Sequence, residues 1–368
     1  MDNRLKSLDV FRGMTVFFMI IVNSTGNWST TYAPLLHAKW HGFTPTDFVF
    51  PAFLFAVGCS IALVMPKWKK ATPSKVYGKI AKRTAIIFFL GYLMYWFPFF
   101  DWDLESGFSF RPISETRIMG VLQRIALAFG LSSILLYKFS LRTALYITVG
   151  ILVGYWLLMY GLGDYTLQGN FGQKLDLILL GSGHLYGGEG LPFDPEGLLS
   201  TLPCIGNTVA GYATVHYLKT INGMEVKFKL ALAGAALLAL GFLWHYGFPI
   251  NKKLWSSSFV LLTSGISMLL LLGLHYLLDI NSDHKKWPSL FTPMGKNPLF
   301  IYVLSQVGMT ILNWWPSAAH GSMYGSTYVN IFKPFGEYFG AFLFAFTWTM
   351  ICWAVAWWMD KKKIYIKV

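Results

Sequence analysis

Stretches of about twenty apolar residues recur along the whole chain, and short segments between them carry most of the charged side chains. An α-helix of that length crosses the hydrocarbon core of a membrane. The pattern therefore predicts an all-α, polytopic integral membrane protein with about ten transmembrane helices. No internal repeat is evident, and we treat residues 1–368 as one transmembrane domain. The expected helix centres lie near Phe18, Phe55, Leu90, Ala128, Gly150, Asn207, Leu237, Ser267, Val303 and Phe346.

Composition supports the membrane assignment. Of the 368 residues 55% are hydrophobic and 13% charged, about half the charged fraction of a soluble domain. This excludes soluble, disordered and disulfide-scaffold classes. Cys59, Cys204 and Cys352 each lie within an apolar run, which favours buried thiols. The apolar stretch from Met14 to Val22 is not followed by a cleavage pattern, so we expect a retained first helix.

The net charge of +13 is distributed unevenly, because 22 of the 30 Lys and Arg residues fall in alternate connections. The positive-inside rule places these connections and both termini in the cytoplasm. The charge then reflects topology in a multi-pass inner-membrane protein surrounded by lipid, and we expect no nucleic-acid partner. The basic groups are Arg4 to Arg12, Lys67 to Arg83, Lys138 and Arg142, Lys219 to Lys229, Lys285 to Lys296, and Lys361 to Lys367.

The connections on the opposite, extracytoplasmic side are long and rich in polar and aromatic residues, which favours binding of a water-soluble ligand there. The first of them brings Asn23, His37 and Asp47 to one membrane face. A neutral imidazole can take a proton from an attacking amine, a carboxylate can orient that imidazole, and an amide can donate to an oxyanion. Alternatively, Asp47 only caps its helix and His37 only bonds to a loop carbonyl. His37 and His41 at i and i+4 also allow a metal pair, although we expect no metal.

Other polar residues on the extracytoplasmic side are candidates for ligand binding. Arg124 falls about a third of the way into the fourth helix, where an arginine has a structural carboxylate partner such as Asp47, an anionic ligand group or a role as catalytic acid; we assign it to cofactor binding. The other residues are candidates for substrate binding. Carboxylates near an indole suit a sugar, since the ring can stack on the aromatic face. The candidates are Asp194 and Glu196 before the sixth helix, and Asn251, Lys252 and Trp255 before the eighth.

A second polar group is expected on the cytoplasmic side. Lys296 and Asn297 stand at the start of the ninth helix, where free N–H groups and a cation can hold a phosphate. Arg12 lies on the same face, about 16 Å of helix from Asn23 at 1.5 Å per residue. An elongated anionic cofactor that enters from the cytoplasm can therefore present its far end near Asn23 and His37.

Six sequence blocks resemble, in this order, the heparan-α-glucosaminide N-acetyltransferase family and its bacterial relatives. They are RLKSLDVFRGMTVFFMIIVN, HAKWHGFTPTDFVFPAFLFAVG, RIMGVLQRIA, FDPEGLLSTLP, NKKLWSSSFVLLTSG and PMGKNPLFIYV. The resemblance implies a multi-pass enzyme that moves acetyl from cytoplasmic acetyl-CoA to the amine of a terminal glucosamine across the membrane. It also implies that His37 is catalytic and that Asn23 and Asp47 belong to the active site. His41 and Lys296 depart from the family pattern, and we expect the large lumenal domain of the lysosomal enzyme to be absent.

The expected function is thus an acetyl-CoA-dependent N-acetyltransferase with His37 as general base and an amino sugar or short oligosaccharide as acceptor. A covalent acetyl-histidine relay is the mechanistic variant. Two other functions stay open: a secondary transporter of sugars or amino sugars, and an O-acyltransferase that acts on a glycan hydroxyl. A homodimer is the assembly that we consider.

Overall fold

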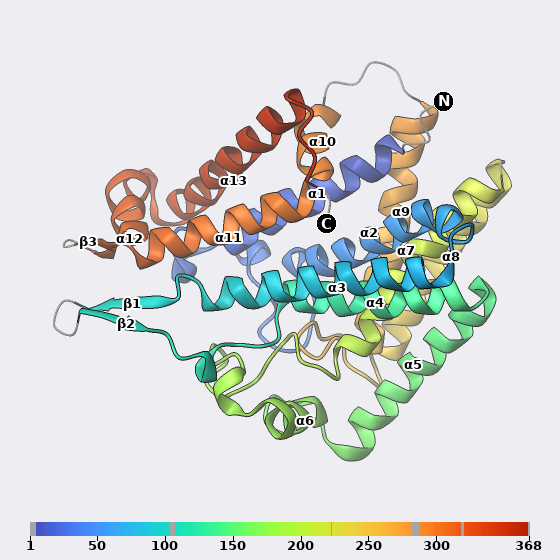
Figure 1. The fold of residues 1–368 in the computed structure, drawn as a ribbon, viewed down its shortest axis with the longest axis horizontal. Helices are drawn as coiled ribbons and strands as arrows, with labels where there is room; N and C mark the ends of the chain where they lie inside the picture. Colours follow the sequence, from blue (N-terminus) through green and yellow to red (C-terminus); the bar gives the residue numbers. More distant parts are fainter. Residues whose placement is uncertain (1–4, 104–106, 222, 282–286, 318–319, 367–368) are drawn as a thin grey trace.

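A computed structural model describes residues 5–103, 107–221, 223–281, 287–317 and 320–366. Arg4, Lys285, Lys286 and Lys367, which belong to the basic groups above, lie outside the described residues. The described chain is predominantly helical, with two short antiparallel hairpins (Figure 1). One pairs β1 (Phe100–Asp103) with β2 (Gly107–Phe110), and the other pairs β3 (Pro316–Ser317) with β4 (Gly321–Ser322).

Each of the ten expected centres lies within a helix, so the hydropathy pattern located these helices correctly. Six described helices are long and apolar enough to cross a membrane: α2, α4, α5, α8, α9 with its extension to Ile280, and α13. The count of about ten spans and the cytoplasmic termini stay predictions. The ten helices are α1 (Lys6–Asn23), α2 (Pro45–Trp68), α3 (Pro73–Trp96), α4 (Val121–Lys138), α5 (Leu141–Leu162), α7 (Thr201–Thr220), α8 (Met224–Trp244), α9 (Ser257–His275), α11 (Pro298–Trp314) and α13 (Glu337–Lys361).

Three shorter helices were not expected from hydropathy: α6 (Phe171–Leu180), α10 (Pro288–Lys296) and α12 (Met323–Thr327). Helix α1 joins two groups of helices. It packs against α10 and α13 on one side and against α2 and α9 on the other. In Figure 1, α10 and α13 accordingly lie above α1, and α3, α4 and α5 lie below it.

Helices α2 and α7 touch through their backbones. A Cβ atom at Gly58 would lie 1.8 Å from the carbonyl oxygen of Thr208, and one at Gly211 would lie 1.9 Å from that of Phe55. Small residues permit this close approach between neighbouring helices in membranes. The contact fixes α2, which carries Asp47 at its start and Ser60 farther along.

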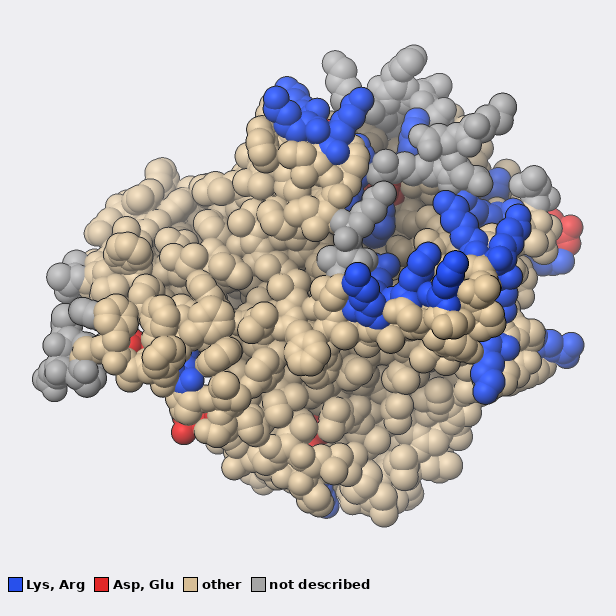
Figure 2. All heavy atoms as spheres, in the orientation of Figure 1, with Lys and Arg blue, Asp and Glu red and all other residues tan. Residues whose placement is uncertain are grey.

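The two ends of the bundle differ in charge. Lys and Arg side chains gather around a hollow at the right-hand end of Figure 2, and much of the remaining visible surface is uncharged. We call this the basic end; it includes the N-terminal turns of α1 and the exposed connection between α2 and α3. The connection between α1 and α2 begins at the opposite end of α1 and contains His37. We call that end the His37 end.

Candidate active site

The centre of the site at the His37 end is a histidine–carboxylate pair. Nδ1 of His37 lies 2.7 Å from Oδ1 of Asp47. The Asp47 side chain is fully buried, whereas that of His37 is 36% exposed. The pair therefore has one side fixed in the protein and one side open.

The local sequence explains why Asp47 is held so firmly. It is the third residue of α2, and its Oδ2 accepts hydrogen bonds from the backbone N–H groups of Thr44 (3.0 Å) and Ala38 (3.1 Å). One carboxylate thus makes the contacts of a helix cap and also contacts the imidazole that we expect it to orient. With Oδ1 accepting from Nδ1–H of His37, the free electron pair of the imidazole lies on Nε2.

Lys252 lies directly against this imidazole. Its Nζ is 3.0 Å from Nε2 of His37 and 3.2 Å from Nδ1. Burial lowers the pKa of His37 and the Lys252 ammonium lowers it further, while Asp47 acts in the opposite direction. Because the net shift is downward, His37 is neutral at neutral pH and can act as a base.

Asn251 shapes the turn that presents Lys252. Its Oδ1 accepts from the backbone N–H of Leu254, three residues on, at 2.8 Å and so holds the turn together. Its Nδ2 lies 3.3 Å from Nδ1 of His41, and the N–H of Gly42 donates to the carbonyl of Ile250 at 2.8 Å. Asn251 thus ties the His37 segment to the Lys252 turn. The described residues contain no group of three or more side chains placed to hold a metal ion.

The two expected acidic residues meet a single arginine, which the sequence analysis did not single out. Arg117 donates to Asp194 through Nε (2.8 Å) and Nη2 (2.7 Å), and Nη2 also lies 2.6 Å from Oε2 of Glu196. Burial raises the pKa of Glu196, but Arg117, Arg124 and Lys252 together hold it below its ordinary value. Arg117 stands in a loop among other polar residues, so no local signal marked it.

Arg124 lies in the first turn of α4, nearer the helix start than expected, because α4 begins only at Val121. It is fully buried, and no ion pair with Asp47 or another acid is found within the described chain. Its Nη2 donates to the Gly197 carbonyl at 3.2 Å and to the Ser200 hydroxyl. Nε and Nη1 have no hydrogen-bond partner among the described residues.

Trp255 does not present its ring to solvent, contrary to what a sugar-stacking role requires. The side chain is fully buried, and its Nε1 donates to Oδ1 of Asn207 at 3.1 Å. The Arg124 guanidinium lies 4.8 Å from the ring centroid. A sugar can stack on this ring only if the core opens. Asn23 is the last residue of α1, as expected, and is half-buried; the described contacts place neither His37 nor Asp47 within hydrogen-bond distance of its side chain.

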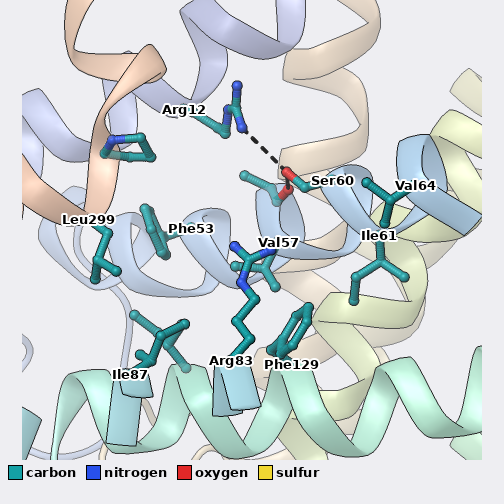
Figure 3. A pocket seen from close by; sticks show the side chains of 13 residues that line it. Arg12, Phe53, Val57, Ser60, Ile61, Val64, Arg83, Ile87, Phe129 and Leu299 are labelled. Atoms are coloured by element: carbon teal, nitrogen blue, oxygen red, sulfur yellow. Dashed lines mark hydrogen bonds between the residues drawn. The ribbon is translucent and has the colours of Figure 1, made fainter. Parts of the chain in front are cut away.

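A second polar group lies toward the basic end, around a pocket of about 80 Å³ between α1, α2, α3, α4 and α11 (Figure 3). Arg12 pairs with Asp9 at 2.5 Å and lies 3.5 Å from the hydroxyl of Ser60. Arg83 projects into the same pocket from α3, and its guanidinium lies 4.6 Å from the ring centroid of Phe129. Nε of both arginines is buried without a hydrogen-bond partner in the described part of the chain.

Sequence reasoning placed Arg83 only among the loop charges, because it ends the run of basic residues that begins at Lys67. In the structure it lies within α3.

The other two residues expected to bind the anionic cofactor, Lys296 and Asn297, already have hydrogen-bond partners within the protein. Nζ of Lys296 bonds to both carboxylate oxygens of Asp360, at 2.6 and 2.8 Å. Asn297 donates to the Ile364 carbonyl and accepts from the N–H of Ile366, both at 2.9 Å. These contacts fasten the last turn of α13 and the segment after it to the start of α11. Neither side chain meets a phosphate unless this segment moves.

Together, the apolar helices and the His37–Asp47 pair define a membrane protein with a hydrogen-bonded histidine and carboxylate at one end of a helical bundle. The chain belongs to the heparan-alpha-glucosaminide N-acetyltransferase family, since the family described as "Heparan-alpha-glucosaminide N-acetyltransferase, catalytic" matches residues 4–243. It is similar to heparan-alpha-glucosaminide N-acetyltransferase of Homo sapiens, with 28% identity; the match covers 83% of this chain and 53% of the relative. The Mus musculus protein of the same name is 27% identical, with 85% and 54% covered. The chain spans about half the length of these curated relatives.

Proposed function

We propose that this protein transfers an acetyl group from acetyl-CoA directly to the amine of a terminal glucosamine or related amino sugar. The observation that carries the proposal is the His37–Asp47 pair at 2.7 Å, with Nε2 on the open side, in a chain of this family. Membership in an N-acetyltransferase family favours transfer over solute transport, and an amine acceptor over a hydroxyl acceptor.

His37 is the general base of this reaction. The acceptor nitrogen attacks the thioester carbonyl, a C–N bond forms, and Nε2 takes a proton from that nitrogen. Asp47 stabilises the resulting imidazolium through Nδ1–H, as the buried carboxylate does in a Ser-His-Asp triad. The C–S bond then breaks, and the thiolate leaves and takes up the proton. Asn23 is proposed as a donor to the tetrahedral oxyanion.

The acceptor amine must reach the position that Nζ of Lys252 occupies beside Nε2. Glu196, held ionised by Arg117, is the nearby carboxylate proposed to bind an acceptor hydroxyl or ammonium group, with Asp194 keeping Arg117 in place. Asn251 positions Lys252 through the turn. Nε and Nη1 of Arg124 are available to an oxygen atom of the donor.

The donor is proposed to enter at the basic end, where Arg12 and Arg83 meet an anionic group. Their pocket continues along α2 from Val64 to Phe53 with apolar walls. Phe53 lies six residues, or about 9 Å of helix, from Asp47. A long donor with a charged head and a slender arm fits this path, although about 80 Å³ is well below the usual size of ligand sites, so binding must widen the pocket.

The positive-inside rule places the basic end in the cytoplasm and His37 on the extracytoplasmic side of an inner membrane. Ten spans, a single domain and a homodimer are parts of the same proposal. Lys296 and Asn297 contribute to acetyl-CoA binding once the last turn of α13 and the segment after it are displaced.

The test uses purified protein in liposomes, with acetyl-CoA outside and a fluorescent glucosaminide inside or outside. We expect release of CoA thiol and formation of the N-acetyl sugar, both abolished in His37→Ala. Lys39→Ala, at an exposed position of the same loop, is the matched control. Thiol release at the level of His37→Ala in every arrangement would show that the protein is not such a transferase.

A further inference from the structure

The two adjacent lysines of the Lys252 turn have different surroundings. Nζ of Lys253 lies 2.6 Å from Oε2 of Glu189 and donates to the Lys39 carbonyl at 2.9 Å. Nζ of Lys252 has no carboxylate within ion-pair distance in the described chain and instead lies 3.0 Å from Nε2 of His37. A general base must come this close to the nitrogen from which it takes a proton. Lys252 thus meets the geometric requirement for an acceptor amine.

We propose that Lys252 is an internal acetyl acceptor, so that the protein acetylates its own side chain when acetyl-CoA is bound and no amino sugar is present. The inference rests on the proposed function. It adds a covalent modification site and a reason for the acceptor to displace Lys252 before transfer.

The step balances without any other reactant. The Lys252 ammonium gives one proton to Nε2 of His37, and the neutral amine attacks the thioester carbonyl. A C–N bond forms, the C–S bond breaks, and the CoA thiolate leaves and takes up the second nitrogen proton. His37 returns its proton to water. Lysine and acetyl-CoA thus become acetyl-lysine, CoA thiol and one released proton, with no change of oxidation state.

The charges around the turn favour the reactive form of the amine. Burial lowers the pKa of Lys252; Lys253 and Arg124 act in the same direction, while Glu196 and Asp47 oppose them. A lowered pKa increases the fraction of neutral, nucleophilic amine. At His37, the carboxylates of Asp47 and Glu196 oppose the positive charge of Lys252. They can therefore stabilise the imidazolium that forms during the step.

Acetylation has a structural consequence. The acetylated side chain loses its charge and places an amide beside Nε2, where the sugar amine must bind. A chain modified in this way should bind the acceptor poorly. An amino sugar that occupies the site should in turn protect Lys252.

The experiment incubates the purified full-length protein with radiolabelled acetyl-CoA without acceptor, and locates the label by peptide mass spectrometry. We expect one main labelled residue, Lys252, with label that resists neutral hydroxylamine, as an amide does. His37→Ala should label at least about tenfold more slowly, since general-base catalysis contributes that much or more. Lys252→Arg should lose the label and Lys253→Arg should keep it. Adding the glucosaminide should suppress labelling.

Other results would overturn the inference. Hydroxylamine-sensitive label on His37 would assign a covalent relay instead. Equal labelling of many lysines, unaffected by His37→Ala, would show uncatalysed chemistry. Normal sugar acetylation with Lys252 unlabelled would refute the internal acceptor and leave the proposed function standing. Absence of both sugar acetylation and labelling would refute the proposed function as well.

Discussion

The His37 site and the arginine pocket toward the basic end satisfy their polar atoms differently. At the His37 site, Asp47 bonds to His37 and to two backbone N–H groups, and Arg117 holds two carboxylates. In the pocket, Nε of Arg12 and of Arg83 are buried without a partner among the described residues. A site whose groups already hold one another is preorganised, whereas unpaired buried donors are ready for a ligand. Substitutions at the first site should therefore change kcat, and substitutions at the second should change KM for the donor.

The largest effect is expected at the centre of the first site. In Asp47→Asn, the amide can still accept the backbone N–H bonds, but it cannot both do so and hold His37 in the tautomer with a free Nε2. We expect kcat to fall by about 10⁴-fold, the cost of the equivalent change in a Ser-His-Asp triad. CoA thiol release with saturating substrates measures it. Asp164→Asn, an exposed aspartate in another connection, is the control, and a loss below about tenfold would refute the orienting role.

Substitution of an arginine in the pocket should change KM for acetyl-CoA rather than kcat. Arg83→Met removes a guanidinium that has no carboxylate partner in the described structure, so the fold loses little while the donor loses a charged hydrogen bond. Such a bond contributes about 1.5–3 kcal/mol, which corresponds to a rise in KM for acetyl-CoA of about 10–100-fold with kcat nearly unchanged. Lys82→Met, on the exposed face of the same helix, is the matched control. A fall in kcat at constant KM would remove the distinction between the two sites.

A third prediction concerns the support of the acidic turn at the His37 end. Asp176 lies in α6, and its side chain is buried. Its Oδ1 accepts a hydrogen bond from the N–H of Leu198 at 3.0 Å. Burial raises the pKa of Asp176 from the usual 3.8 to about 7. Between these values the folded state retains a proton that the unfolded state has lost, so stability falls as pH rises from about 4 to about 7. Asp176→Asn keeps the acceptor and removes this penalty.

We expect Asp176→Asn to raise the free energy of unfolding at pH 8 by about 1–2 kcal/mol and much less at pH 4.5. Thermal unfolding at the two pH values measures the difference. An equal shift at both would show that the ionisation of Asp176 has no part in the effect.

Much of the fold could be predicted because hydropathy and capping are local properties of the sequence. Asn23 ends α1 and Asp47 lies in the first turn of α2, as expected from apolar runs and a helix-start pattern. His37 and Asp47 are ten residues apart, so a single short connection brings them together.

The rest depends on contacts between distant segments, which no local pattern encodes. Arg117 reaches Asp194 from 77 residues away, and Lys296 reaches Asp360 from 64 residues away. The position of Trp255 before a helix indicated an accessible loop, but the turn folds its indole into the core against Asn207. Arg12 and Arg83 share a pocket because α1 and α4 both pack on α2, and α3 packs on α4.

The smallest effect is expected at the ion pair between Lys296 and Asp360. Asp360 holds Lys296 and also accepts from the Tyr365 hydroxyl at 2.8 Å. Asp360→Asn should lower the free energy of unfolding by less than about 1 kcal/mol, because this pair is partly exposed. Hydrogen exchange at Ile364 and Ile366 should become faster.

Freed from its partner, Lys296 should then lower KM for acetyl-CoA about two- to threefold, an effect of the size of an exposed ion pair. Asp360→Glu, which keeps the charge, is the control. Faster exchange with an unchanged KM would make Lys296 an anchor for the chain terminus alone and leave donor recognition to Arg12 and Arg83.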